Sequence, residues 1–121
     1  MEDLTQEQLR VREILIDRAK RAQTICYSDL VNLAKLNLDM TNPFHRALLG
    51  KVLGAISSFE HANGRPMLSS VVVSKETNSP SDGFYKLADE LGHGDWRKLK
   101  QNLWGFQELK RAFEYWQGSD K

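Results

Sequence analysis

Several side chains in this chain belong to types that do covalent chemistry, but none has the neighbours which that chemistry requires. Ser69 and Ser70 have no base nearby, and Cys26 has no recognisable histidine or acidic partner, so each is expected to be structural. Lys75 and Asp82 are the residue types of a nuclease-like metal site, but the second strand carboxylate of such a site is missing. The sequence therefore predicts no catalytic residue.

Metal and nucleotide sites are not predicted either. His45, His61 and His93 lie in different segments and lack the i, i+4 spacing with which a helix presents two metal ligands. Gly50 and Gly54 fall inside a predicted helix rather than in a phosphate-binding loop. A single cysteine excludes an internal disulfide and every multi-cysteine zinc site. We expect no metal and no cofactor.

Cationic residues offer a different chemistry, the recognition of phosphate. From Arg10 to Lys51 the chain has eight basic residues against four acidic ones, although its net charge is only +1. Small residues at 47, 50, 54 and 57 form a line on the helix that carries some of these cations, which permits a backbone to approach closely. That backbone is either another part of the chain or a ligand's phosphates. The predicted nucleic-acid-binding residues are His45, Arg46, Lys51, Arg18, Lys20, Arg21 and Lys75.

The segment from Glu76 to Asp95 has the opposite charge, since it contains five acidic residues and one lysine. Such a surface suits a basic protein effector, which an exposed tryptophan could anchor, although core packing is the simpler role for the aromatic residues. The predicted protein-binding residues are Asp82, Asp89, Glu90, Asp95 and Trp96.

Local signals predict the elements that position these residues. Thr5 and Gln8 fit a capping box at the start of a helix, and Asn42-Pro43 is a cap followed by the position where proline suits a helix. Residues 67–75 are rich in β-branched side chains, and 76–83 have the composition of an exposed turn. We predict helices at about 5–23, 28–36, 43–62, 86–91 and 95–117, and strands at about 24–27, 67–75 and 83–85.

Composition indicates one folded domain, since 40% of the 121 residues are hydrophobic and 27% are charged. No apolar run approaches the ~18 residues of a membrane span, and the N-terminus is acidic, so a cytoplasmic location and no membrane partner are expected. The predicted fold class is α+β, a mostly helical winged-helix-like domain with a small β-hairpin and a long C-terminal helix. In a single domain of residues 1–121, the helix at 95–117 would pack on a winged-helix-like core at 5–75.

Two segments resemble a known family. "ICYSDLVNLAKL" followed by "LGKVLGAIS", about residues 25–58, resembles the DNA-binding domain of alkylguanine-DNA alkyltransferases and alkyltransferase-like proteins. The resemblance implies a winged-helix domain that binds DNA. The family's reactive Pro-Cys-His-Arg motif would fall near "RPMLSSVVVSK", which has neither cysteine nor histidine, so alkyl transfer is not implied. The family's helix arginine has no counterpart in register, because Arg46 lies one residue too early.

"NGRPMLSSVVVSKETNSPSDGFYKLADELG" and "FEYW" are also similar to small uncharacterised bacterial proteins with G-R-P-x-L-S-x-V-V-V, G-F-x-x-L-A-x-E-L-G and Y-x-Y-W motifs. This resemblance implies turns that define the fold, or a shared surface, at Arg65, Pro66, Gly83, Phe84 and Tyr85.

The sequence as a whole predicts a non-enzymatic module that binds a macromolecule, with nucleic acid as the first candidate. The alternative is a protein-binding inhibitor, such as the immunity protein of a bacterial toxin or a phage counter-defence protein. The two differ in which charged surface meets the partner.

Overall fold

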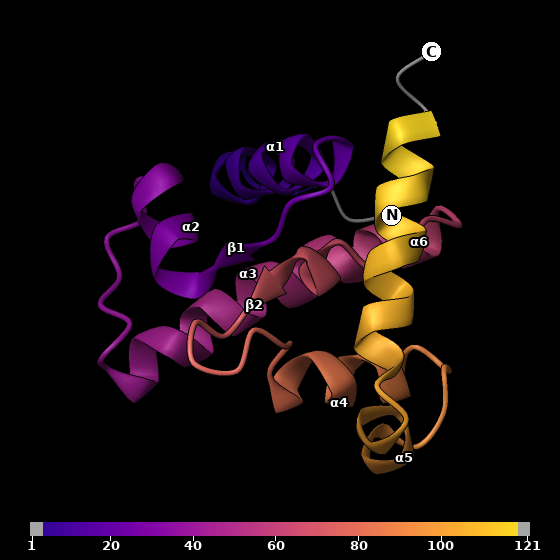
Figure 1. Cartoon of the computed structure of the whole chain (residues 1–121). Helices are drawn as coiled ribbons and strands as arrows, with labels where there is room; N and C mark the ends of the chain where they lie inside the picture. Colours follow the sequence, from indigo (N-terminus) through magenta and orange to yellow (C-terminus); the bar gives the residue numbers. More distant parts are fainter. Residues whose placement is uncertain (1–3, 119–121) are drawn as a thin grey trace.

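Figure 1 shows the computed structural model of the chain, which describes residues 4–118. The fold is α+β and mostly helical, with one two-stranded parallel sheet. The elements in chain order are α1 (Gln6–Lys20), β1 (Ile25–Cys26), α2 (Tyr27–Leu33), α3 (Pro43–Ala62), the 3-10 turn η1 (Leu68–Val71), β2 (Val72–Val73), α4 (Asp82–Glu90), α5 (Trp96–Gln101) and α6 (Trp104–Gly118).

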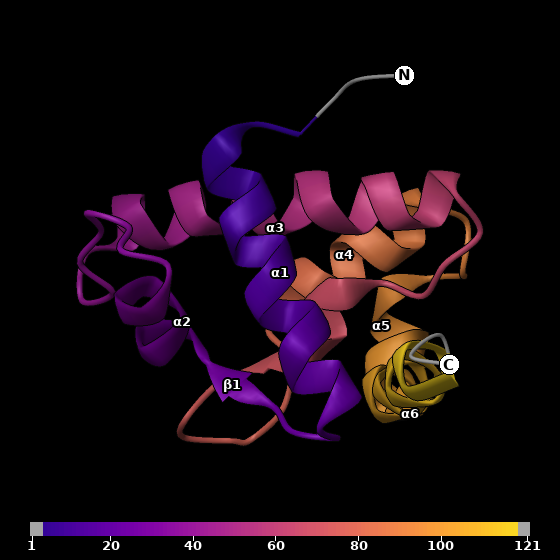
Figure 2. The same cartoon turned by 90° about the horizontal axis from the view of Figure 1, so that it is seen from above.

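Helix α3 crosses the width of the molecule and organises the other elements (Figures 1 and 2). α1 packs on one side of α3 and α4 on the other, while α6 stands across one end and contacts α1, α5 and η1. The turn η1 contacts α1, α3 and α6, and its Leu68 and Val71 are fully buried. This turn therefore lies at the centre of the fold.

Both predicted helix starts are confirmed. Thr5 Oγ1 accepts a hydrogen bond from the Gln8 backbone N–H at 3.1 Å, and Gln8 Oε1 accepts one from the Thr5 N–H at 2.9 Å. Asn42 Oδ1 accepts from the Phe44 N–H at 2.8 Å, and Pro43 is the first residue of α3. These side chains satisfy N–H groups that the first turn of a helix leaves without partners.

The predicted β-hairpin is wrong. Ile25 pairs with Val72 and Cys26 with Val73, so the sheet is parallel and joins the start of α2 to the segment before α4. Residues 68–71 of the predicted strand at 67–75 form the turn η1 instead, and the Ser70 hydroxyl donates to the Met67 carbonyl at 2.7 Å. Such a local bond offers the backbone an alternative to a strand.

The predicted return strand at 83–85 lies in α4. The pattern of Phe84, Leu87, Ala88 and Leu91 places apolar residues on one helical face, which packs with Met67 in a second core cluster. The burial of this apolar face outweighs the β-propensity of Phe84 and Tyr85. Leu91 and Gly92, whose φ is +95°, end the helix where the sequence predicts its end.

The predicted helix at 95–117 is two helices, because α5 ends before Asn102 and α6 begins at Trp104. Leu103 between them has a left-handed backbone with φ +57°. Gly105 is buried, and its N–H donates to the Tyr85 hydroxyl at 3.1 Å. The start of α6 is therefore held against α4, which a straight continuation of α5 would not achieve.

No helix within residues 4–118 has the length and apolarity needed to cross a lipid bilayer.

Candidate functional site

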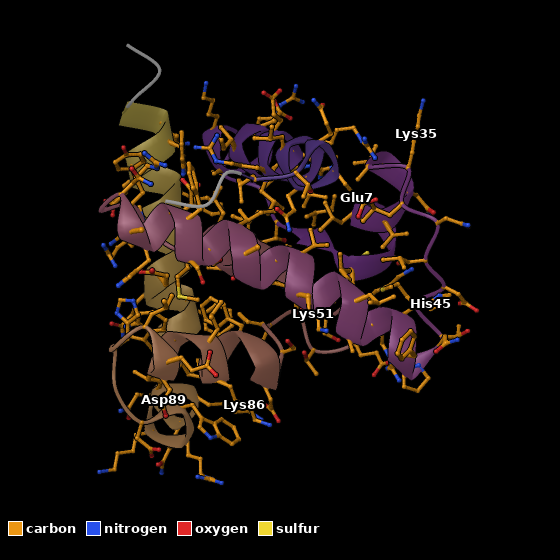
Figure 3. The ribbon with its side chains drawn as sticks, turned by 180° about the vertical axis from the view of Figure 1, so that it is seen from behind. Glu7, Lys35, His45, Lys51, Lys86 and Asp89 are labelled. Carbon is orange, nitrogen blue, oxygen red and sulfur yellow. The ribbon has the colours of Figure 1, made fainter. Side chains whose placement is uncertain are left out.

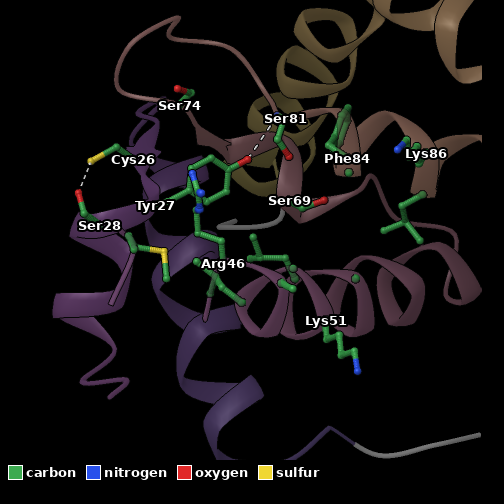
Figure 4. A pocket seen from close by; sticks show the side chains of 18 of the residues that line it. Cys26, Tyr27, Ser28, Arg46, Lys51, Ser69, Ser74, Ser81, Phe84 and Lys86 are labelled. Carbon is green, nitrogen blue, oxygen red and sulfur yellow. Dashed lines mark hydrogen bonds between the residues drawn. The ribbon is translucent and has the colours of Figure 1, made fainter. Parts of the chain in front are cut away.

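A groove of about 670 Å³ lies between α3, α4, the start of α2 and the loop of residues 74–81 (Figure 4). Its lining is mainly apolar and includes Tyr27, Met40, Leu49, Leu53, Phe84 and Leu87. The Ser81 N–H donates to the Tyr27 hydroxyl at 3.3 Å, so the loop is tied to α2 across one end of the groove. A concave, largely apolar surface of this volume is typical of ligand sites.

The small residues of α3 face this groove. Ala47, Gly50 and Gly54 line it. A Cβ atom placed at Gly50 would meet no atom within 4 Å, and one at Gly54 would meet only Leu87 Cδ2 at 3.9 Å. Within residues 4–118, therefore, no backbone packs closely against these glycines. The interpretation that they serve packing within the chain fails at Gly50.

Four cationic side chains line the groove: Arg46, Lys51, Lys75 and Lys86. All four are exposed, and the two carboxylates that accompany them belong to Glu76 and Glu90. Arg46 extends toward the Tyr27 ring, while Lys51 projects from the outer edge of α3 (Figure 4). From behind, Lys51 is seen on α3 and Lys86 on α4 below it (Figure 3). The rim therefore has an excess of positive charge.

His45 is predicted to act beside Arg46 and Lys51, but it does not line the groove. It is half-buried, and its Nδ1 accepts a hydrogen bond from the Asp39 backbone N–H at 2.8 Å. The Thr41 hydroxyl and backbone N–H both donate to Asp39 Oδ1, which holds the pKa of this carboxyl below its ordinary value. His45 thus braces the turn that leads into α3.

The predicted flanking cations lie elsewhere. Arg18 and Arg21 line a shallow depression of about 450 Å³ between α1 and α2, which shares no lining residue with the groove. Arg18 donates to the Thr24 carbonyl at 3.4 Å, and Arg21 pairs with Asp17 at 3.3 Å. Lys20 is exposed at the end of α1. The fold does not bring these three side chains together with Arg46 and Lys51.

Two of the four predicted acidic residues, Asp82 and Asp89, join α4 to α5. Asp82 pairs with Lys100, with Nζ and Oδ1 2.6 Å apart, and Asp89 Oδ2 accepts from the Trp96 backbone N–H at 3.0 Å. Asp95 occupies the cap position of α5, but its side chain makes no cap hydrogen bond. Glu90 faces the groove instead.

The Cys26 Sγ lies 3.5 Å from the Ser28 hydroxyl oxygen, and both residues line the groove. Ser69 lines it, but its hydroxyl is hydrogen-bonded to the buried Ser57 hydroxyl at 2.6 Å. Met67, in the segment where the alkyltransferase resemblance places a reactive cysteine, is fully buried. Over residues 4–118 no three His, Cys, Asp or Glu side chains are grouped so that they could hold a metal ion.

Sequence analysis missed Lys86, Tyr27 and Phe84 as groove residues. The sequence predicts a strand at 83–85 and a helix from Lys86, whereas Phe84 and Lys86 both lie in α4. The apolar spacing from Phe84 to Leu91 is the signal that could have identified α4.

No family model, no curated protein and no solved structure matches the chain.

Proposed function

We propose that this chain binds nucleic acid through the groove beside α3. The observation that carries the proposal is the combination of a cationic rim, formed by Arg46, Lys51, Lys75 and Lys86, with an open floor at Gly50. Phosphate groups are the ligands that a set of exposed cations from separate segments suits best.

The empty space beside Gly50 supports the proposal that a ligand lies close to α3. A glycine inside a helix costs about 1 kcal/mol relative to alanine. Gly50 has no neighbour within 4 Å of the position its Cβ would take, so this cost is not offset by packing within residues 4–118. A bound backbone would provide the missing contact, as would be expected where a sugar-phosphate chain lies against the helix.

The order of α2, the turn after it and α3 supports a winged-helix-like surface, which would contact the phosphate backbone of either a paired or an unpaired strand. In this proposal α3 presents Arg46 and Lys51, and the loop of residues 74–81 takes the place of the wing with Lys75. The resemblance of residues 25–58 to the DNA-binding domain of alkyltransferases points to the same kind of partner. The alternative, a protein inhibitor bound through acidic residues, has less support because Asp82 and Asp89 are already engaged within the chain.

Charge reversal tests the cationic rim. Arg46→Glu and Lys51→Glu should each weaken binding of a labelled oligonucleotide by about ten-fold or more at about 50 mM salt, measured by fluorescence anisotropy. Lys110→Glu, an exposed lysine on α6 outside the groove, is the matched control and should bind as the wild type does. If the wild-type chain binds neither DNA nor RNA at this salt concentration, the proposal is wrong.

A second variant tests the floor of the groove without changing its charge. Gly50→Gln should keep the fold, because the Cβ position is open and glutamine favours helices, yet it should block the approach of a ligand. Ala62→Gln, at the exposed end of α3 outside the groove, should leave binding unchanged. Equal affinities of the two variants would exclude the floor as a contact surface.

A further inference from the structure

The positive rim of the groove continues from α4 onto α5. Lys86 lines the groove, and its Nζ lies 5.2 Å from the centroid of the Trp96 ring. The guanidinium carbon of Arg97 lies 4.8 Å from the same ring. Lys86, Trp96 and Arg97, here called the aromatic–cation track, therefore link the groove to an exposed helix that is rich in basic residues.

Two contacts hold the aromatic–cation track in place. The Asp89 carboxylate accepts from the Trp96 backbone N–H at 3.0 Å, and Lys100 pairs with Asp82 at 2.6 Å. Both join α5 to α4, so the backbone that carries Trp96 is held against α4, and the Trp96 ring packs on the second core cluster. An aromatic ring beside cations is a surface on which an unpaired base can stack while neighbouring phosphates are neutralised.

We propose that the groove and the aromatic–cation track together bind a single strand of nucleic acid. This inference rests on the proposed function and names its substrate class. A duplex presents phosphates and paired bases, and it offers no exposed base face to a mainly apolar, concave groove. A single strand can place bases against Tyr27 and Phe84 in the groove and another on Trp96, with Lys86 and Arg97 at its phosphates.

The contacts that a base must displace are weak. An exposed cation over an aromatic ring contributes less than a base stacked on the same ring. Lys86 and Arg97 are both exposed, so each side chain can move from the ring face to a phosphate without losing buried contacts. Trp96 is half-buried, so one part of the ring stays packed on α4 while another meets the strand.

The experiment compares oligonucleotides of one sequence as single-stranded DNA, single-stranded RNA and a DNA duplex, each of about 12 nucleotides. Anisotropy gives the affinity, and quenching of tryptophan fluorescence reports contact with an indole ring. The wild type should bind either single strand at least about ten-fold more tightly than the duplex, with quenching. The DNA and RNA arms identify which strand the groove prefers.

Variants of Trp96 separate stacking from folding. Trp96→Leu should weaken single-strand binding by about ten-fold and remove most of the quenching. Trp96→Phe retains an aromatic ring, so it should retain most of the affinity while losing the same quenching. Trp96→Phe is expected to bind without quenching. A loss of stability in Trp96→Leu could lower the affinity of that variant, but it could not produce binding without quenching in Trp96→Phe.

Variants of the cations test the phosphate contacts. Arg97→Gln should lower the slope of log affinity against log salt by about 0.7 for a single strand. Lys110→Gln removes the same charge from α6, outside the groove and the aromatic–cation track, and should leave the slope unchanged.

The outcomes separate this inference from the proposed function. Suppose that Arg46→Glu and Lys51→Glu lose binding, while Trp96→Leu and Arg97→Gln keep both the binding and the quenching of the wild type. The groove would then bind nucleic acid, but the aromatic–cation track would not contact it. Preference for the duplex would also overturn it. Absence of binding to all three probes would overturn both.

Discussion

A Cβ atom at residue 105 would lie 2.6 Å from the Tyr85 hydroxyl oxygen and 3.0 Å from Cγ of Pro80. Both neighbours belong to buried residues, so neither can move aside freely. The Gly105 N–H also donates to that hydroxyl at 3.1 Å. The missing side chain of Gly105 therefore makes room for the contact between α4 and α6.

Gly105→Ala should lower the free energy of unfolding by about 1–3 kcal/mol, because an added methyl group overpacks this contact. Gly50→Ala is the matched control, since its Cβ would meet no atom within 4 Å. The control should raise the same free energy by up to about 1 kcal/mol through helix propensity. Urea denaturation measures both, and a Gly105→Ala variant as stable as the wild type would contradict the contact.

His93 should make stability depend on pH. Its ring lies 4.8 Å from that of Trp104 and 5.3 Å from that of His61, and its Nε2 is buried without a hydrogen-bond partner among residues 4–118. Burial lowers the pKa of His93; the Glu108 carboxylate opposes this effect, and the nearby His61 and Arg111 reinforce it. The folded state therefore favours the neutral ring.

A group whose pKa is lowered by folding stabilises the fold above its unfolded value, about 6.5 for histidine, and destabilises it as the pH falls below that value. The free energy of unfolding should therefore decrease between about pH 7.5 and pH 5.5. His93→Gln should reduce this dependence, as measured by urea denaturation at several pH values. An unchanged slope in the variant would show that other groups cause it.

At the scale of an element, the end of α1 also depends on whether its residue has a Cβ atom. Ala22, just after α1, has φ +54°, and the following Gln23 N–H donates back to the Arg18 carbonyl at 2.9 Å. This is the position where a helix most often ends in glycine. Alanine there adopts a backbone conformation that is unfavourable for any residue with a Cβ atom.

Ala22→Gly should therefore raise the free energy of unfolding by about 0.5–1 kcal/mol. Ala47→Gly makes the same chemical change at an exposed position inside α3 and should lower it by about 1 kcal/mol. Thermal denaturation of the two variants should give shifts of opposite sign. Two shifts of the same sign would contradict the assignment of Ala22 to the left-handed end of the helix.

Elements were predictable where their signals are local. The bounds of α3 agree with the predicted range 43–62, and Asn42 and Pro43 set its start through the backbone of its own first turn. The hairpin was wrong because β2 pairs with β1, a partner far away in the chain. The break at Leu103 was missed because it depends on the contact of the next helix with Tyr85.

At the scale of the whole molecule, the groove was predictable only in part. Arg46 and Lys51 share one helix with the glycines, so the sequence places them together. Lys86 and Tyr27 reach the same groove only because α4 packs on α3 and because β1 pairs with β2. These contacts join segments that are far apart in the sequence, so no local sequence pattern predicts them.

A buried carboxylate joins three helices on the other side of α3. Glu60 is fully buried; its Oε2 accepts from Arg12 Nε at 2.7 Å and its Oε1 from Arg65 Nε at 2.6 Å. The Arg12 guanidinium, from α1, also lies 5.5 Å from the ring centroid of Phe59 and 5.7 Å from that of Trp116 on α6. The network therefore connects α1, α3 and α6 through one charge.

Because a buried charge is tolerable only while it is paired, the two arginines should not act independently. Arg12→Met or Arg65→Met leaves one partner for Glu60, but the double variant leaves none and should lose about 3–5 kcal/mol, more than the two single losses together. Adding Glu60→Met to the double variant removes the unpaired charge, so urea denaturation should show stability regained. The explanation is wrong if the triple variant is no more stable than the double variant. It is also wrong if the losses of stability in the two single variants add up to the loss in the double variant.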